Sequence, residues 1–287
     1  MQIRILFVVW SLYIAGFQRY QSHNQNYAMK KIFLIGIVFI VYSICAVAQN
    51  VVLVEQFTET GCGACSQYDS AFNAITNRNA DKVAVINYHC FYVLDTFNLF
   101  NKGGSDRNNF YSFNQGFPSA AVNGKMPRPN YAHVAYVNEQ VITDQFNRPP
   151  QFNFEIVCTP AAKGSVHQAT INIKATALKY IPVKDLRLFV AVTENNINYE
   201  QRYHTKSVNG INEFQHIFRA MLPDMNGTLI GSQSNGQKNK VKLTFTNDDR
   251  EMNYKEVRLV VFVQDYETKE VLGSAVMKDN PFLGAGK

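Results

Sequence analysis

The sequence predicts a chain of two parts: an α/β domain built on a parallel strand–helix–strand unit, followed by an all-β antiparallel sandwich. Three observations support this fold class. Two short apolar, β-branched runs flank a helical segment in the first part. Cys62 and Cys65 stand where the first run gives way to the helix. After residue 149, apolar and polar residues alternate with a period of two.

The first 48 residues have the features of an export signal. Met29-Lys30-Lys31 is followed by an apolar run over 32–45 and then by Ala46-Val47-Ala48, which fits a small-x-small cleavage site. We therefore expect a signal peptide over residues 1–48, with translation starting at Met29 and cleavage after Ala48. An uncleaved anchor is the alternative, because signal cores and short membrane spans overlap in length.

The charge of the chain gives no basis for a nucleic-acid partner. The net charge is +6, but residues 1–48 carry four basic residues and no acidic one, which leaves 24 basic against 22 acidic residues in the remainder. A nearly neutral processed chain lacks the positive field that attracts phosphate backbones. Export also means an oxidising surrounding in which disulfides persist. Four cysteines remain there: Cys62, Cys65, Cys90 and Cys158.

The α/β domain is expected over residues 49–148. Residues 51–57 form a continuous apolar run, which is typical of a strand buried on both faces, and residues 82–88 form another. Residues 62–77 predict the helix between them, and strand, helix and strand in this order indicate a parallel βαβ unit. Residues 131–146 predict the last helix of the domain. The apolar face of the first helix is expected to hold Tyr68, Phe72 and Ile75.

The two cysteines of Cys62-Gly63-Ala64-Cys65 are spaced for redox chemistry. Residues at i and i+3 lie on the same side of a helical turn, close enough to form a disulfide. Cys62 would lie in the first turn, where free backbone N–H groups and the helix dipole favour a thiolate. Because the thiolate is the attacking species in disulfide exchange, we assign Cys62 as the nucleophile and Cys65 as the resolving thiol. The partners would be protein thiols or disulfides.

A proline precedes the next strand of the domain. Pro118 stands directly before an apolar run that ends in a turn-forming Asn123-Gly124 pair. Together with residues 54–65, this segment resembles a thioredoxin-like domain, and more closely the outer-membrane-protein-28-type family of envelope proteins. Those proteins join an N-terminal thioredoxin-like domain to a C-terminal β domain. The resemblance covers the chain from about residue 51 to its end.

The resemblance implies a location and further site residues. It implies a bacterial envelope protein, in the periplasm, the outer membrane or at the cell surface. It also implies a cis Phe117–Pro118 peptide bond facing the two cysteines, with Phe117 and Pro118 binding substrate. Thioredoxins bury an acid on the first strand near the cysteines, and Glu55 is the nearest candidate, one residue from Gln56.

The chain departs from the thioredoxin pattern around the cysteines. Thioredoxins carry Trp before the first cysteine and Gly-Pro between the two, whereas this chain has Gly61 before and Gly63-Ala64 between. Part of the usual docking surface is therefore absent, and the redox potential does not carry over from the family.

Two other interpretations of the thiols remain open. Cys62–Cys65 can be an inert, permanent bridge, or Cys62, Cys65, Cys90 and His89 can bind zinc, although zinc sites usually show two paired-ligand knuckles and only one is present. We expect no metal and no cofactor. His89 and Cys90 follow the second strand, on the edge that carries function in such sheets. They are candidate accessory residues, while burial of Cys90 in the core, or a bridge from it to Cys158, is the alternative.

The sandwich domain is expected over residues 149–287. Alternating runs such as Ile171, Ile173 and Ala175 are separated by Gly, Asn and Asp clusters, which is typical of short antiparallel strands. Catalytic side chains do not cluster in this part of the sequence, so it is expected to position the first domain or to bind an envelope partner. The sequence therefore supports an exported thiol–disulfide oxidoreductase. The alternative is a non-catalytic binding or structural envelope protein, and membrane association stays open in both.

Overall fold

The computed structural model describes residues 46–48, 51–90, 95–100, 103–113, 115–163, 166–247, 252–277 and 280–282. Apart from Ala46–Ala48, the predicted signal peptide lies outside these residues, as does the predicted start at Met29. Ala46–Ala48 form strand β1, which pairs antiparallel with β5 (Phe152–Lys163). The predicted cleavage site after Ala48 thus directly follows a strand that is paired in this structure.

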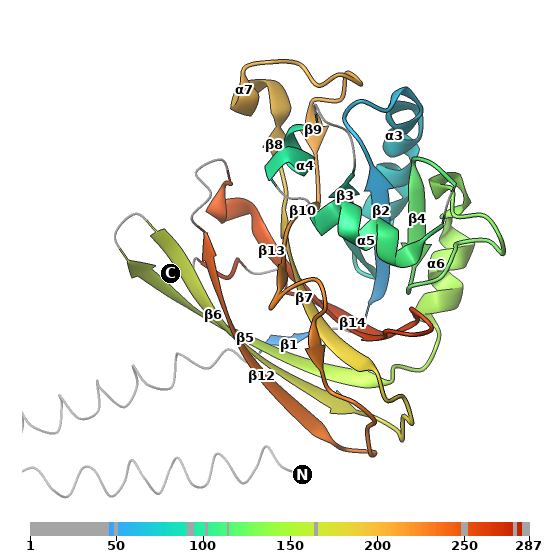
Figure 1. Cartoon of the computed structure of the whole chain (residues 1–287), viewed down its shortest axis with the longest axis vertical. Coiled ribbons are helices and arrows are strands. Elements are labelled where there is room, and N and C mark those ends of the chain that lie inside the picture. The colour runs from blue at the N-terminus through green and yellow to red at the C-terminus, as the bar shows by residue number, and fades with distance from the viewer. Residues whose placement is uncertain are drawn as a thin grey trace, which may run out of the picture. The chain divides into compact units, whose positions relative to one another are not determined.

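A mixed sheet of eight strands runs through the molecule in the order β14-β13-β7-β10-β3-β2-β4, with β11 paired to β7 (Figure 1). The strands β2 and β3 are parallel, and β4 is antiparallel to β2. The bounds are β2 (Val52–Thr58), β3 (Val83–His89), β4 (Ser119–Val122), β7 (Leu186–Glu194), β10 (Ile217–Leu222), β11 (Thr228–Leu229), β13 (Val257–Asp265) and β14 (Val271–Met277).

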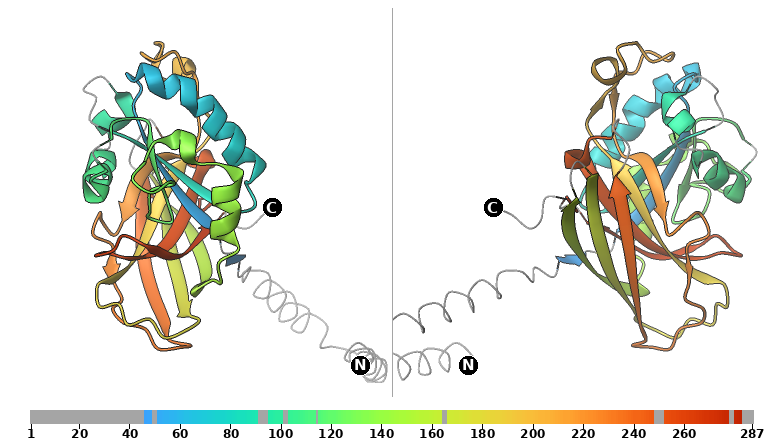
Figure 2. Two further views of the ribbon diagram at one scale, coloured as in Figure 1. Left: turned by 90° about the vertical axis from the view of Figure 1, so that its right-hand side faces the viewer. Right: turned by 60° about the vertical axis from the view of Figure 1, so that its left-hand side comes forward.

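Helices cover both faces of the β2–β3–β4 part of this sheet (Figure 2). Helix α3 (Gly63–Arg78) connects β2 to β3, and its Phe72 packs with Val52, Val54 and Ile142 of α6 (Glu139–Phe146) on one face. Helix α5 (Gly103–Tyr111) packs on the other face, where Tyr111 joins Phe57 and Tyr88. The predicted parallel strand–helix–strand unit is therefore present, with both faces of its strands buried.

A second, antiparallel sheet packs against the β7–β13–β14 part of the first. Its order is β1-β5-β6-β12, with β6 spanning Val166–Ala177 and β12 spanning Lys238–Asn247. The alternation noted in the sequence corresponds to its core side, because Ile171 and Ile173 are buried against Val190 and Leu259 of the first sheet. Strands β8 (Ile197–Asn198) and β9 (Glu213–Phe214) form a small third sheet that flanks helix α7 (Tyr199–Tyr203).

The two predicted domains share the mixed sheet instead of forming separate sheets. Strand β10 lies after residue 149, yet it pairs in parallel with β3 through Ile217 and Asn87. The backbone N–H of Asn87 also donates to the carbonyl of His216 at 2.8 Å. Without this pairing, β3 would present an open edge to solvent, which native sheets avoid.

The segment 131–146, predicted as one helix, is broken into three parts. His133 forms an isolated bridge with Ser119, a 3₁₀ turn follows at Val134–Tyr136, and α6 begins only at Glu139. The side chain of Asn138 ends the turn and starts α6 by accepting a hydrogen bond from the Val141 N–H at 3.0 Å. The break follows from this cap, whose competing local hydrogen bond disfavours a continuous helix.

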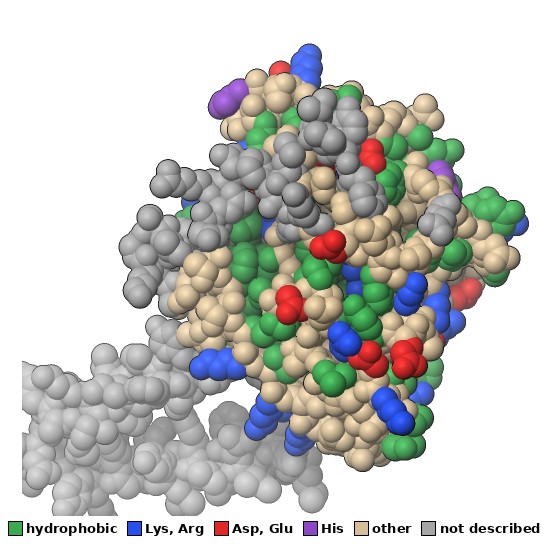
Figure 3. All heavy atoms as spheres, viewed as in Figure 1, with side chains coloured by type: hydrophobic (Ala, Val, Ile, Leu, Met, Phe, Trp, Pro, Cys, Tyr) green, Lys and Arg blue, Asp and Glu red, His purple; other side chains and the backbone are tan. Residues whose placement is uncertain are grey.

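The surface of the described residues carries both signs of charge. On the face seen in Figure 3, Lys and Arg side chains lie among Asp and Glu side chains. Tyr68, expected on the apolar face of α3, is 37% exposed and packs edge-on against His133. Among the residues described above, no helix is both long and apolar enough to cross a membrane.

Candidate redox site

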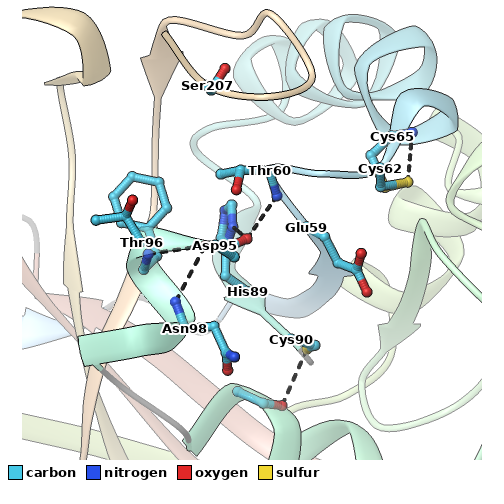
Figure 4. Close-up of polar contacts among 12 residues, drawn as sticks. Glu59, Thr60, Cys62, Cys65, His89, Cys90, Asp95, Thr96, Asn98 and Ser207 are labelled. Atoms are coloured by element: carbon cyan, nitrogen blue, oxygen red, sulfur yellow. Dashed lines mark hydrogen bonds and ion pairs between the residues drawn. A yellow bond between two sulfur atoms is a disulfide. The ribbon is translucent and has the colours of Figure 1, made fainter. Parts of the chain in front are cut away.

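Cys62 and Cys65 form a disulfide at the start of α3. Cys62 is the N-cap residue, and its Sγ atom accepts a hydrogen bond from the Cys65 N–H at 3.0 Å (Figure 4). The first turn of α3 contains no acidic residue, so nothing there offsets the positive end of the helix. Cys62 is partly exposed, whereas Cys65 is fully buried. The two sulfur atoms therefore differ in their access to an incoming substrate.

The loop before β4 lies beside the disulfide. The Phe117–Pro118 peptide bond is cis, as the resemblance implied, and the carbonyl oxygen of Phe117 lies 3.9 Å from the Cys62 Sγ atom. A cleft of about 230 Å³ borders the same loop. Its lining is uncharged and combines the polar side chains of Asn108, Asn109 and Ser112 with Phe113 and Phe117. The polar side chains suit hydrogen bonds to the backbone of an extended peptide.

A side-chain hydrogen bond between Gln56 and Asp69 connects β2 to α3. The side-chain N–H of Gln56, which is 2% exposed, donates to the Asp69 Oδ1 atom at 2.6 Å. Burial raises the pKa of Asp69 to about 6, although the hydrogen bond from Gln56 and the charge of His89 oppose this. Asp69 follows Cys65 by four residues, which places both on one face of the helix. A carboxyl that titrates near neutral pH there can take up the proton of a buried thiol.

Glu55 lies on the opposite face of β2 from Gln56, away from the cysteines. It forms a buried ion pair with Arg107 of α5, at 2.7 and 3.1 Å, and accepts hydrogen bonds from Tyr88 and Tyr111. The structure thus does not place Glu55 where the resemblance suggested. Because both faces of β2 are buried, the sequence pattern gives no sign of which residue faces α3.

Asp95 connects His89 to the loop before the disulfide. The His89 Nδ1 atom lies 2.7 Å from the Asp95 Oδ2 atom, and that oxygen also accepts from the Thr60 N–H at 2.7 Å (Figure 4). Burial would raise the pKa of Asp95, but the charge of His89 and backbone hydrogen bonds outweigh it and hold the pKa below its usual value. The sequence flagged His89 by its position, but gave no signal for Asp95 as its partner.

Asn209, from the second half of the chain, holds the same loop from another side. Its backbone N–H donates to the Thr60 carbonyl at 2.7 Å, and its side-chain N–H donates to the Glu59 carbonyl at 3.2 Å. Asn209 lies in the turn between α7 and β9. Nothing in the sequence indicated this role, since a contact across 150 residues leaves no local signal.

Cys90 points toward α5 instead of toward the disulfide. Its Sγ atom lies 3.4 Å from the Gly104 carbonyl, and its pKa is raised strongly by burial and further by the charges of Asp95 and Glu59. Cys90 and Cys158 are both free, so the bridge between them is not formed. The proposed zinc ligands are not assembled either: no group of three or more His, Cys, Asp or Glu suited to a metal occurs within the described part of the chain.

The parallel β2–α3–β3 unit, the cysteine pair at the start of α3 and the cis proline before antiparallel β4 define a thioredoxin-like domain. The sequence model of the family described as outer membrane protein Omp28 matches residues 108–280. That match spans more than half of the chain, so the chain belongs to this family, whose description indicates an envelope location.

The comparison with solved structures includes one of similar fold. HBP35 of Porphyromonas gingivalis is 17% identical, with a TM-score of 0.64 over 84% of this chain and 79% of that chain. Protein AGR_C_4864 from Agrobacterium tumefaciens is 19% identical, with a TM-score of 0.48 over 84% of this chain and 98% of that chain. At such identities the first likeness shows the fold alone. A comparison with curated proteins gives no match.

Proposed function

We propose that the Cys62–Cys65 pair exchanges disulfides with protein substrates in the cell envelope. The observation that carries this proposal is the unequal exposure of the two sulfurs, with Cys62 reachable from solvent and Cys65 fully buried. An attacking thiol must reach its substrate, while a resolving thiol needs only to reach the first sulfur. The position of Cys62 at the helix start favours its thiolate form.

The exchange balances as two successive displacements. The Cys62 thiolate attacks one sulfur of a substrate disulfide, so a Cys62–substrate bond forms and the other substrate sulfur leaves as a thiolate. The Cys65 thiolate then attacks the Cys62 sulfur, which restores the Cys62–Cys65 bond and releases the second substrate sulfur as a thiolate. Two electrons pass from the protein dithiol to the substrate. The reverse sequence oxidises a substrate dithiol.

The surroundings of the pair fit a polypeptide substrate. The Phe117 carbonyl lies beside the Cys62 sulfur, while Pro118 is buried behind it. The uncharged cleft along this loop offers amide and hydroxyl groups to a peptide backbone. Asp69 would receive the proton that the Cys65 thiol loses before the second displacement.

The test uses the full chain in an insulin-reduction assay with dithiothreitol. We expect Cys62→Ser to abolish turnover and Cys65→Ser to accumulate a mixed disulfide between Cys62 and the substrate, because the second displacement is blocked. Cys158→Ser is the matched control, since Cys158 is a free cysteine in β5 and should leave turnover unchanged. Equal turnover in Cys62→Ser and the unsubstituted chain would rule out the mechanism.

A non-catalytic envelope protein is the second candidate, and the family comparison favours it. The matched residues 108–280 include the sandwich but exclude both cysteines, so family membership does not depend on them. In that case the thioredoxin-like part is a scaffold, and the sandwich binds a surface partner. A Cys62–Cys65 bridge that resists millimolar dithiothreitol in the folded protein, and is reduced only after unfolding, would favour this candidate.

A further inference from the structure

A cavity of about 330 Å³ opens where the mixed sheet changes from one half of the chain to the other. Strand β10 pairs with β7 from Ile217 to Leu222, but with β3 through Ile217 and Asn87 alone. Within the described sheet, no further ladder pair joins β3 to β7, β13 or β14. Beyond the cavity, the N–H of Val51, the residue before β2, donates to the Ser274 carbonyl of β14 at 3.1 Å. The second half of α3 borders the cavity.

The two walls of the cavity differ in character. Arg258 and Val260 of β13 share one face of their strand, and their neighbours across the sheet, Thr193 and Val276, line the same wall. The opposite wall consists of side chains from β3, from the end of α3 and from the turn between them, including Val83, Val85 and Ala80. The cavity therefore has an extensive apolar lining with one guanidinium at its side.

The charge of this lining is positive. Neither Asp nor Glu is among the lining residues. His216 also borders the cavity, and its pKa is lowered to about 4 by burial and by the nearby charge of Arg258. The Nη1 atom of Arg258 donates one hydrogen bond to the Val257 carbonyl at 2.8 Å. A guanidinium has five N–H donors in a planar fork, which suits a carboxylate.

We propose that this cavity binds a small monocarboxylate with a short apolar chain. The carboxylate pairs with the Arg258 guanidinium, with the Thr193 hydroxyl and the Asn195 amide as neighbouring donors. The chain lies against the valines of both walls. Burying that chain provides the driving force, and the guanidinium selects an anion over a neutral or cationic molecule of the same shape. The site is separate from the disulfide, so it does not depend on the exchange chemistry.

The test is calorimetric titration of the full chain with hexanoate, and with hexan-1-ol and hexylamine as neutral and cationic probes. We expect saturable binding of hexanoate and weaker or absent binding of the other two. Arg258→Gln should weaken hexanoate binding about ten- to a hundredfold, which is the loss expected for a charge-assisted hydrogen bond. Arg148→Gln, which removes an exposed guanidinium outside the cavity, is the matched control and should bind as before.

A second variant separates a lost site from a lost fold. Val276→Phe places a larger side chain into the cavity from the half-buried edge strand β14, where a bulkier side chain is tolerated more readily than in a closed core. It should weaken hexanoate binding while the thermal unfolding temperature without ligand stays near that of the unsubstituted chain. The Cys62→Ser chain should bind hexanoate normally. Absence of saturable binding, equal affinity for hexan-1-ol, or unchanged binding in Arg258→Gln would each overturn the proposal.

Discussion

Replacing Asp69 by Asn should stabilise the protein at neutral pH and leave it nearly unchanged in acid. The carboxyl of Asp69 titrates near 3.8 when solvated, but burial raises its pKa to about 6 in the folded protein. Between these values the folded state holds a proton that the unfolded state has released. By linkage, the free energy of unfolding therefore falls as pH rises through this window, and the loss is complete above the folded pKa.

The size of the effect follows from the shift in pKa. Each unit corresponds to about 1.4 kcal/mol, so a shift of about two units amounts to roughly 3 kcal/mol. Asp69 is partly exposed, and solvent screening reduces this to about 1–2 kcal/mol. An Asn side chain can still accept the hydrogen bond from Gln56 through its Oδ1 atom, but it never ionises. The gain should therefore appear only where Asp69 is charged.

Urea unfolding of both chains at pH 4 and pH 8, followed by circular dichroism, measures the difference. We expect the gain in free energy of unfolding from Asp69→Asn to be about 1–2 kcal/mol larger at pH 8 than at pH 4. Asp144→Asn is the matched control, because Asp144 is exposed on α6. Its effect on the free energy of unfolding should be nearly the same at pH 4 and pH 8. A stability difference for Asp69→Asn that does not depend on pH would refute the reasoning.

Three further substitutions test the supports of the site. Arg107→Met leaves the buried carboxylate of Glu55 without its ion partner, and urea unfolding should show a loss of about 3–5 kcal/mol. Asn209→Ala removes the side-chain hydrogen bond to the Glu59 carbonyl and keeps the backbone bond to Thr60, so urea unfolding should show a loss of about 1 kcal/mol and stopped-flow measurement faster reduction of the disulfide by dithiothreitol. Gly124→Ala puts a Cβ 1.7 Å from a backbone carbonyl oxygen, whereas Gly210→Ala, with the same positive φ, meets open space. Thermal unfolding should therefore show a clearly larger loss for Gly124→Ala than the roughly 1 kcal/mol expected for Gly210→Ala.

Local signals in the sequence are enough to predict the parallel strand–helix–strand unit and the cysteine pair at its turn. The apolar runs and the Cys62-x-x-Cys65 spacing involve neighbours in the chain, and the structure places them in β2, α3 and β3. The same kind of reasoning failed for residues 131–146, because valines at helical spacing also occur along the 3₁₀ turn that precedes α6. Periodicity reports which side chains are buried, but not whether the backbone between them is continuous.

Contacts between distant segments could not be predicted in this way. Glu55 and Gln56 both lie on a strand without a solvated face, so their polarity did not reveal which one faces the cysteines. The answer depends on Arg107, which reaches Glu55 from α5, and on Asp69, which reaches Gln56 from α3. Likewise, nothing near Asn209 in the sequence indicates that it contacts the loop before the disulfide.

These long-range contacts explain why the thioredoxin-like part and the sandwich occur in one structural unit. The Arg107 guanidinium donates to Glu55 of β2 and to Gln264 of β13, so one buried cation holds together strands from both halves of the chain. Without Gln264, the buried Arg107 guanidinium would lose one hydrogen-bond acceptor. Leaving part of a buried charge without a partner costs free energy of folding. Because Asn209 also fixes the loop before Cys62, the geometry of the candidate redox site depends on residues of the second half, and not on the strand–helix–strand unit alone.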